Sequence, residues 1–141
     1  MAKAKAKDYT PYAGTTVHWQ KTQGQITDLL SKHGIDDVRF AYLGSHKSLC
    51  LEFIRPEVFD GQKVNIAVRI VVPGIDETNR NQLHRALLYY LKSKFESLQF
   101  GFVEFVQEFL PHLVLQDSYG RSNTVYQLLG PQYKEGVVSG I

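Results

Sequence analysis

The sequence predicts one α+β domain, in which a three- to four-stranded antiparallel meander is covered on one face by a long helix and a short N-terminal helix. Between Val38 and Val72, apolar and polar residues alternate with period two, which is typical of half-buried strands joined by short turns. Two further stretches space their apolar residues by three or four, which is typical of amphipathic helices. The 141 residues fit a single domain that folds without a metal or disulfides.

The first helix is predicted over residues 23–33. Thr22 and Gln25 form a capping-box pattern, and Ile26, Leu29 and Leu30 follow at helical spacing. Gly34 suits the left-handed position that ends a helix.

Three strands are predicted next, over residues 38–43, 49–54 and 63–72. One face of the resulting sheet is almost purely apolar. The other face carries Arg39, Lys63 and Arg69 with a single acid, Glu52.

A helix of about 32 residues, some 48 Å long, is predicted to start near Thr78 and to end before Pro111. Its apolar positions step by three or four without a break: Leu83, Leu87, Leu91, Phe95, Leu98, Phe102, Val106 and Phe109. A ten-residue strand is only about 33 Å long. The helix is therefore expected to bend at Gly101 or to overhang the sheet, where its Phe-rich half would meet another molecule.

The remaining segments complete the predicted organisation. Residues 113–116 suit a short fourth strand, and a brief helix from Ser122 or Asn123 is expected to stop at Gly130-Pro131. Residues 1–16, with their Lys/Ala alternation, are predicted to form a flexible basic arm, residues 17–130 the domain, and residues 131–141 a loose tail.

Charge is sorted along the chain. The net charge of +2 arises in the first ten residues, and the remainder is neutral. Basic residues without acids occupy 78–95, whereas acids without Lys or Arg occupy 96–117. Two functional explanations stay open beside simple solvation: a track for phosphates, or a two-fold dimer in which the long helices pair antiparallel.

The sequence contains no recognisable catalytic constellation. Cys50 is the only cysteine and lies in mid-strand, the five histidines lack metal-ligand spacing, and nucleotide-binding and nucleophile motifs are absent. No apolar run reaches the roughly 18 residues of a membrane span. We therefore expect a cytoplasmic protein that is not an enzyme and has no cofactor or metal, in the host cytoplasm if it is viral.

The charge pattern favours a non-enzymatic, oligomeric accessory protein that binds nucleic acid, namely single-stranded DNA, through phosphate contacts and through loop aromatics that stack on bases. The predicted contact residues are Lys3, Lys5, Lys7, Arg39, Lys63, Arg69, Arg80, Arg85, Lys92 and Lys94. The alternative is an oligomeric interaction protein, such as an inhibitor of a host factor or an assembly component. It would dock through the Phe-rich half of the long helix, at Phe100, Phe102, Phe105 and Phe109.

Three motifs resemble a family of small proteins from phages, mobile elements and environmental genomes. They are His33-Gly34 at the end of the first helix, Arg80 and Arg85 leading to Glu108-Phe109-Leu110-Pro111, and Gly120-Arg121 before the last short helix. Because the family has no established activity, the resemblance implies no catalytic role. It does imply a place in viral or mobile-element DNA metabolism.

Overall fold

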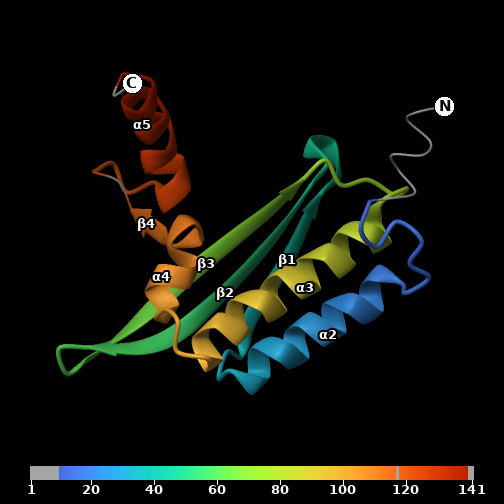
Figure 1. Ribbon diagram of the computed structural model, residues 1–141, viewed down its shortest axis with the longest axis horizontal. Helices are drawn as coiled ribbons and strands as arrows, with labels where there is room; N and C mark the ends of the chain where they lie inside the picture. Colours follow the sequence, from blue (N-terminus) through green and yellow to red (C-terminus); the bar gives the residue numbers. More distant parts are fainter. Residues whose placement is uncertain (1–9, 117, 140–141) are drawn as a thin grey trace.

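The computed structural model describes residues 10–116 and 118–139, and it confirms the α+β class and the antiparallel meander (Figure 1). The strands pair in the order β1-β2-β3 and comprise β1 (Asp37–Leu43), β2 (Ser48–Phe59) and β3 (Gln62–Pro73). A 3-10 turn, η1 (Gly44–His46), joins β1 to β2. The register sets Leu51 opposite both Phe40 and Ile70, so the apolar residues of the three strands share one face as predicted.

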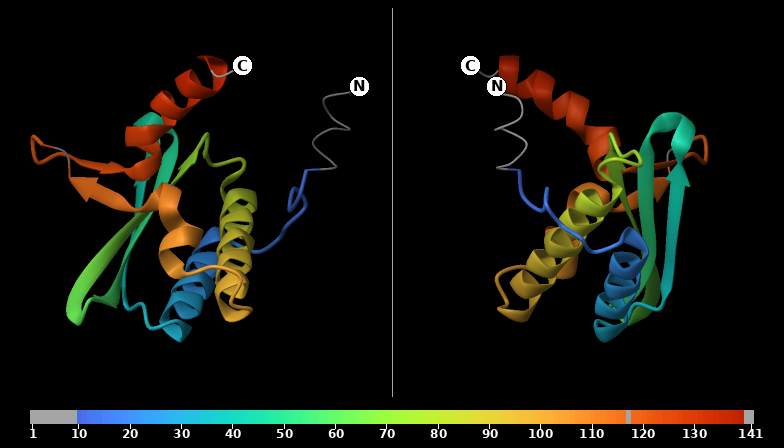
Figure 2. Two further views of the ribbon diagram at one scale, coloured as in Figure 1. Left: turned by 60° about the vertical axis from the view of Figure 1, so that its left-hand side comes forward. Right: turned by 90° about the vertical axis from the view of Figure 1, so that its right-hand side faces the viewer.

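Two helices, α2 (Trp19–Lys32) and α3 (Arg80–Gln99), pack side by side on this apolar face (Figure 2). The core lies between these helices and the sheet. Its most deeply buried apolar residues include Ile26, Leu30, Leu49, Leu51, Phe53, Val68, Leu88, Leu91 and Phe95. Burial of this layer is the main favourable contribution to folding.

The first helix begins four residues earlier than predicted. His18 is its N-cap, and the ring nitrogen Nδ1 accepts a hydrogen bond from the backbone N–H of Gln20. The next free donor, the N–H of Trp19, bonds to Asn81 Oδ1 on α3 at 2.9 Å. Thr22 is fully buried instead of capping the helix. The sequence pattern missed this start because half of the cap comes from another element.

The prediction of one continuous helix is wrong, but the chain does turn at Gly101, the residue at which a bend was expected. Helix α3 ends at Gln99, Gly101 takes a left-handed φ of +73°, and α4 (Phe105–Phe109) starts in a new direction. Glu104 and Gln107 form a reciprocal capping box at the start of α4, which satisfies N–H groups that a continuous helix would have used internally.

This break changes the role of the Phe-rich segment. Phe105 and Phe109 are 5% and 0% exposed, and the ring of Phe109 contacts those of Phe53, Phe95 and Phe105. The two residues therefore belong to the core and are not available to a partner, contrary to the prediction. Only Phe100 and Phe102 remain exposed, at 72% and 76%.

The predicted fourth strand does not extend the main sheet. After the 3-10 turn η2 (Leu110–His112), β4 (Val114–Gln116) pairs with β5 (Ser122–Thr124) in a separate two-stranded sheet. A single bridge between Val68 and Leu113 ties this hairpin to β3.

The last helix is longer than predicted. Helix α5 (Val125–Ser139) runs through Pro131 and projects away from the body (Figure 1). Thr124 and Gln127 cap its first turn reciprocally, at 2.8 and 3.2 Å. A proline inside a helix removes one hydrogen bond and costs about 3 kcal/mol, but it need not end the helix. The expected loose tail is therefore helical up to Ser139.

Candidate functional site

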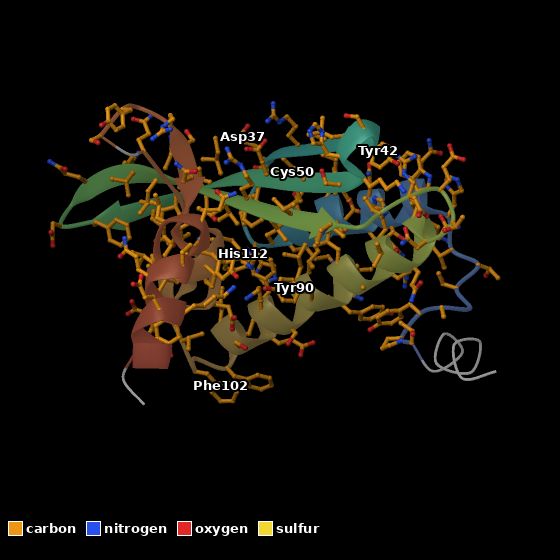
Figure 3. All side chains as sticks on the ribbon, turned by 90° about the horizontal axis from the view of Figure 1, so that it is seen from above. Asp37, Tyr42, Cys50, Tyr90, Phe102 and His112 are labelled. Atoms are coloured by element: carbon orange, nitrogen blue, oxygen red, sulfur yellow. The ribbon has the colours of Figure 1, made fainter. Side chains whose placement is uncertain are left out.

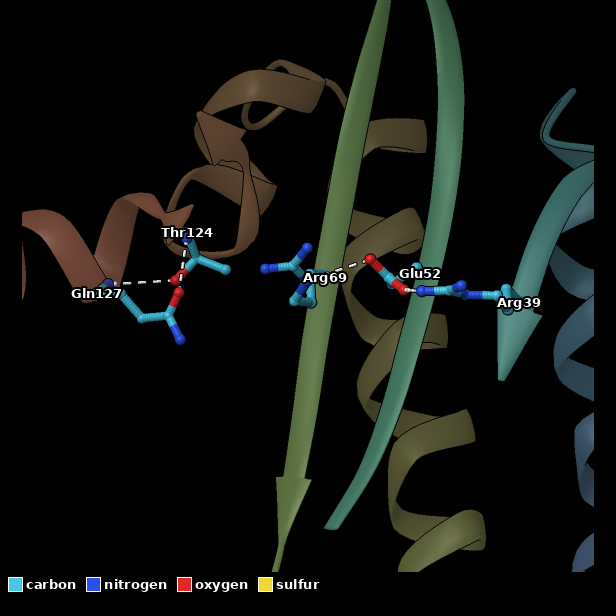
Figure 4. A network of polar contacts seen from close by, with 5 residues as sticks. All are labelled: Arg39, Glu52, Arg69, Thr124 and Gln127. Atoms are coloured by element: carbon cyan, nitrogen blue, oxygen red, sulfur yellow. Dashed lines mark hydrogen bonds and ion pairs between the residues drawn. The ribbon is translucent and has the colours of Figure 1, made fainter. Parts of the chain in front are cut away.

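The outer face of the sheet, opposite α2 and α3, carries an ion cluster across all three strands (Figure 4). Glu52 on β2 accepts hydrogen bonds from Arg39 on β1 and from Arg69 Nε on β3, the latter at 3.1 Å. Burial alone would raise the pKa of Glu52, but the two guanidinium groups outweigh it and lower the pKa. Two predicted phosphate-binding residues thus share one carboxylate.

Around this cluster the outer face is apolar, and the described residues leave it open except beside Arg69 and Val71, where the end of β5 and the start of α5 lie close by. Leu43, Ile54 and Val71 are 51%, 38% and 47% exposed, and half-buried Ala41, Cys50 and Ala67 lie among them. A shallow hollow of about 400 Å³ runs between Arg39 and Ala67. A sheet face left to water normally carries polar residues, so this composition is typical of a contact surface.

Cys50 lies on this face (Figure 3) and is expected to react slowly with thiol reagents. Burial, followed by the negative charge of Glu52, raises the pKa of its thiol above the ordinary value of 9.0. Because the thiolate is the reactive form, the maleimide reaction should be slower than that of free cysteine at pH 7.5 and should accelerate steeply up to pH 9. Stopped-flow rates across this range test the prediction, and a rate equal to that of free cysteine at pH 7.5 would contradict it.

A second candidate site lies at the free edge of β3, where a hydrogen bond of 2.7 Å joins Tyr90 Oη on α3 to His112 Nε2 on η2. The two side chains lie close together between α3 and β3 (Figure 3). They border two hollows of about 360 and 440 Å³ that share Val71 and Pro73. Burial, followed by the charge of Lys94, lowers the pKa of His112.

The basic side chains of the predicted phosphate track on α3 do not form one continuous surface, because several of them contact other parts of the chain. The guanidinium of Arg80 lies between the rings of Trp19 and Tyr42, at 3.8 and 4.2 Å, and its Nε is buried without a hydrogen-bond partner in the described chain. Lys94 forms an ion pair of 3.0 Å with Glu108. The acidic segment therefore neutralises part of the basic segment inside one chain.

Arg85 and Lys92 remain closer to the arrangement that the sequence predicted. They flank Tyr89 at 5.4 and 4.8 Å, and Tyr89 stacks on Tyr12 at 5.1 Å. Neither cation has a carboxylate partner among residues 10–116 and 118–139. Lys63 is exposed near the β2–β3 hairpin, far along the sheet. Lys3, Lys5 and Lys7 lie outside the described residues.

The histidines have structural contacts. His84 is fully buried, and its ring nitrogens contact the carbonyl of Arg80 at 2.7 Å and the amide of Gln23 at 3.1 Å. His33, the C-cap of α2, stacks on Phe95 at 4.1 Å. Within the described part of the chain, no three His, Cys, Asp or Glu residues are grouped so that they could hold a metal ion.

Sequence reasoning did not identify Tyr90 and His112. They are 22 positions apart on different elements, so no local sequence pattern predicts their contact.

Comparisons with known proteins identify no relative: no family model, no curated protein and no solved structure matches the chain. The resemblance to proteins of phages and mobile elements therefore stays a prediction. In the described part of the chain, none of the helices combines the length and the hydropathy that crossing a membrane requires.

Proposed function

We propose that the protein is a non-enzymatic interaction protein that associates with a second copy of itself through the outer face of the sheet. The carrying observation is the exposed apolar surface formed by Leu43, Ile54 and Val71 around the Arg39–Glu52–Arg69 cluster. The same face carries both signs of charge, including exposed Asp37 and Arg39. A two-fold interface needs such a self-complementary surface, because each residue meets the same patch of the other copy.

The size of the face bounds the strength of this association. Three strands about 4.8 Å apart and about 30 Å long give roughly 400 Å². Stable interfaces bury about 800 Å² on each partner, so we expect a weak, concentration-dependent dimer.

Substitution of Ile54 by lysine is expected to abolish the dimer. It places a charge on the middle strand of the face, opposite the start of β1 at Asp37, where dimerisation would desolvate it. Sedimentation equilibrium at protein concentrations from about 10 μM to about 1 mM measures the mass of the protein over the range in which a weak dimer would form. A matched control is Leu129→Lys on α5, which is 54% exposed and lies outside this face.

The proposal predicts that the wild type and Leu129→Lys shift together from monomer to dimer, whereas Ile54→Lys stays monomeric. A wild-type mass equal to one chain at every concentration would refute it.

A second candidate function, binding of single-stranded nucleic acid, is supported by the cluster of Tyr12, Tyr89, Arg85 and Lys92. Exposed rings beside cations without carboxylate partners suit base stacking combined with phosphate contact. The candidate ranks second because Arg39, Arg69 and Lys94 are in ion pairs and the basic and acidic segments do not form one continuous helix.

Nucleic-acid binding is tested with a fluorescent oligo(dT) of about 20 nucleotides, long enough to span one binding site. The double variant Arg85→Gln/Lys92→Gln should weaken binding at least tenfold and flatten its salt dependence, because two phosphate contacts are lost. Lys134→Gln on α5 removes an exposed lysine elsewhere and serves as the control. No detectable binding by the wild type at about 50 mM salt would exclude this function.

A further inference from the structure

The edge of β3 opposite β2 is open from Ile70 to Pro73. Its only strand contact in the described chain is the bridge between Val68 and Leu113. An unpaired edge presents backbone N–H and C=O groups that can pair with another chain. Charges usually block natural edges, as Asp37 and Arg39 do on β1, whereas the open stretch of β3, Ile70-Val71-Val72-Pro73, carries none. Ile70 and Val72 already bond to β2, so the groups that face the open edge are the N–H and C=O of Val71 and the C=O of Pro73.

Hollows flank this edge on both sides of the sheet. On the helix side, a hollow of about 360 Å³ is apolar and is lined by Ile70, Val72, Leu83, Ala86 and Leu87. On the outer side, a hollow of about 440 Å³ is more polar and is lined by Arg69, Thr124, Tyr126 and Gln127. Both hollows reach Val71, Pro73, Tyr90 and His112, so they meet at the strand edge itself.

This arrangement matches the geometry of an added strand. Successive side chains of an extended chain point to opposite faces of a sheet. A fourth strand beside β3 would therefore place every second side chain in the apolar hollow against α3. The side chains between them would enter the outer hollow beside α5, whose largely apolar wall carries the polar groups of Arg69 and Gln127.

The positive charge of Arg69 in the outer hollow indicates which side chains the added strand should present to that hollow. Arg69 uses Nε to bind Glu52, while Nη1 and Nη2 have no hydrogen-bond partner among the residues that the structure describes. A carboxylate at the polar positions of the added strand would complement this guanidinium.

We propose that the open edge of β3 is a docking site for an extended segment of a partner protein, with apolar residues at every second position and acidic residues between them. The segment binds by β-augmentation: main-chain hydrogen bonds supply affinity, and the two hollows supply specificity. This site shares Arg69 and Val71 with the outer-face dimer surface, but peptide docking at the edge does not require the dimer.

A displayed library of random octapeptides, selected on the immobilised full-length chain, provides the test. The expected consensus alternates Ile, Val or Leu with Asp or Glu, and the selected peptide should shift the backbone amide resonances of residues 70–72. N-methylation of alternate peptide nitrogens should weaken binding at least tenfold, because it removes donors to the strand edge.

Variants then locate the site. Ala86→Arg fills the apolar hollow from α3 and should weaken the selected peptide at least tenfold, whereas Ser93→Arg, at an exposed position of the same helix, should change its affinity less than twofold. Arg69→Gln should selectively weaken peptides with acidic residues. Ile54→Lys should leave peptide affinity unchanged even if it abolishes the dimer, which separates this proposal from the proposed function.

The proposal is overturned by a consensus without alternation, by amide shifts confined to other elements, or by a peptide affinity that N-methylation does not change. The peptide experiments keep the proposal testable if Ala86→Arg unfolds. A complex whose mass shows two protein chains joined by this edge without peptide would assign the edge to self-association and would likewise overturn it.

Discussion

Replacement of Phe109 by alanine is expected to lower the free energy of unfolding by about 3–5 kcal/mol. The ring is fully buried, lies 5.5 Å from that of Phe95, and meets Phe53 edge-on at 5.9 Å. Its removal leaves a cavity between α3, α4 and the sheet that rigid neighbours fill only in part. Because total stabilities are about 5–15 kcal/mol, this single change is a large fraction of the whole.

Phe102→Ala is the matched control for this prediction. Phe102 lies in the same segment but is 76% exposed, so its loss should change stability by about 0.5 kcal/mol or less. Urea unfolding followed by the fluorescence of the single Trp19 measures both variants. Equal losses for the two phenylalanines would contradict the packing of α4 in the core.

Acidification from pH 7 to pH 5 is expected to destabilise the fold through three buried or half-buried histidines. Burial lowers the pKa of His33, His84 and His112 below the ordinary value of 6.5, helped by neighbouring cations. The unfolded chain therefore binds protons near pH 6.5 while the folded chain does not. This stability is complete above pH 6.5 and is lost as the pH falls through the lower folded pKa values.

The expected slope is up to about 1.4 kcal/mol per pH unit for each histidine that stays neutral in the fold. Glu52 and Asp76 also have lowered pKa values, but their contribution is lost only at more acid pH, below their ordinary values of 4.5 and 3.8. Between pH 6.5 and 5 the histidines therefore dominate.

Urea unfolding at pH 7.5, 6.5, 5.8 and 5.0 measures this slope. His84→Gln removes the fully buried titrating group and should flatten the dependence by up to about 1.4 kcal/mol per pH unit, whatever it does to stability at pH 7.5. A stability that is constant between pH 7 and 5, or a slope that His84→Gln leaves unchanged, would refute the assignment.

The meander and its buried face could be predicted from the sequence because strand periodicity is a local property. Apolar and polar residues alternate along residues 38–72, and the connections between the strands are short. Together these features predict an antiparallel sheet with one buried face. The left-handed Gly34 could be predicted for the same reason, since a positive φ favours glycine.

The error in the long helix also has a physical cause. Leu98, Phe102, Val106 and Phe109 keep helical spacing although the chain turns at Gly101, so periodicity alone could not reveal the break. The break is stabilised by the burial of Phe105 and Phe109. The ring of Phe109 packs against Phe53 and Phe95, which belong to other elements. Gly101, where a bend was expected, marked the position of the turn, and the Glu104–Gln107 capping pair was the local signal that a new helix starts after it.

The sequence by itself determined the fold class, the apolar face of the sheet and the residues that carry charge. The tertiary structure decided what those charges do, because pairing partners come from separate segments: Glu52 binds Arg39 and Arg69, and Glu108 binds Lys94. It alone also brought Tyr90 to His112 and left one edge of β3 open. Backbone propensity and side-chain period act over a few residues, whereas an ion pair or a free strand edge depends on which distant segments meet.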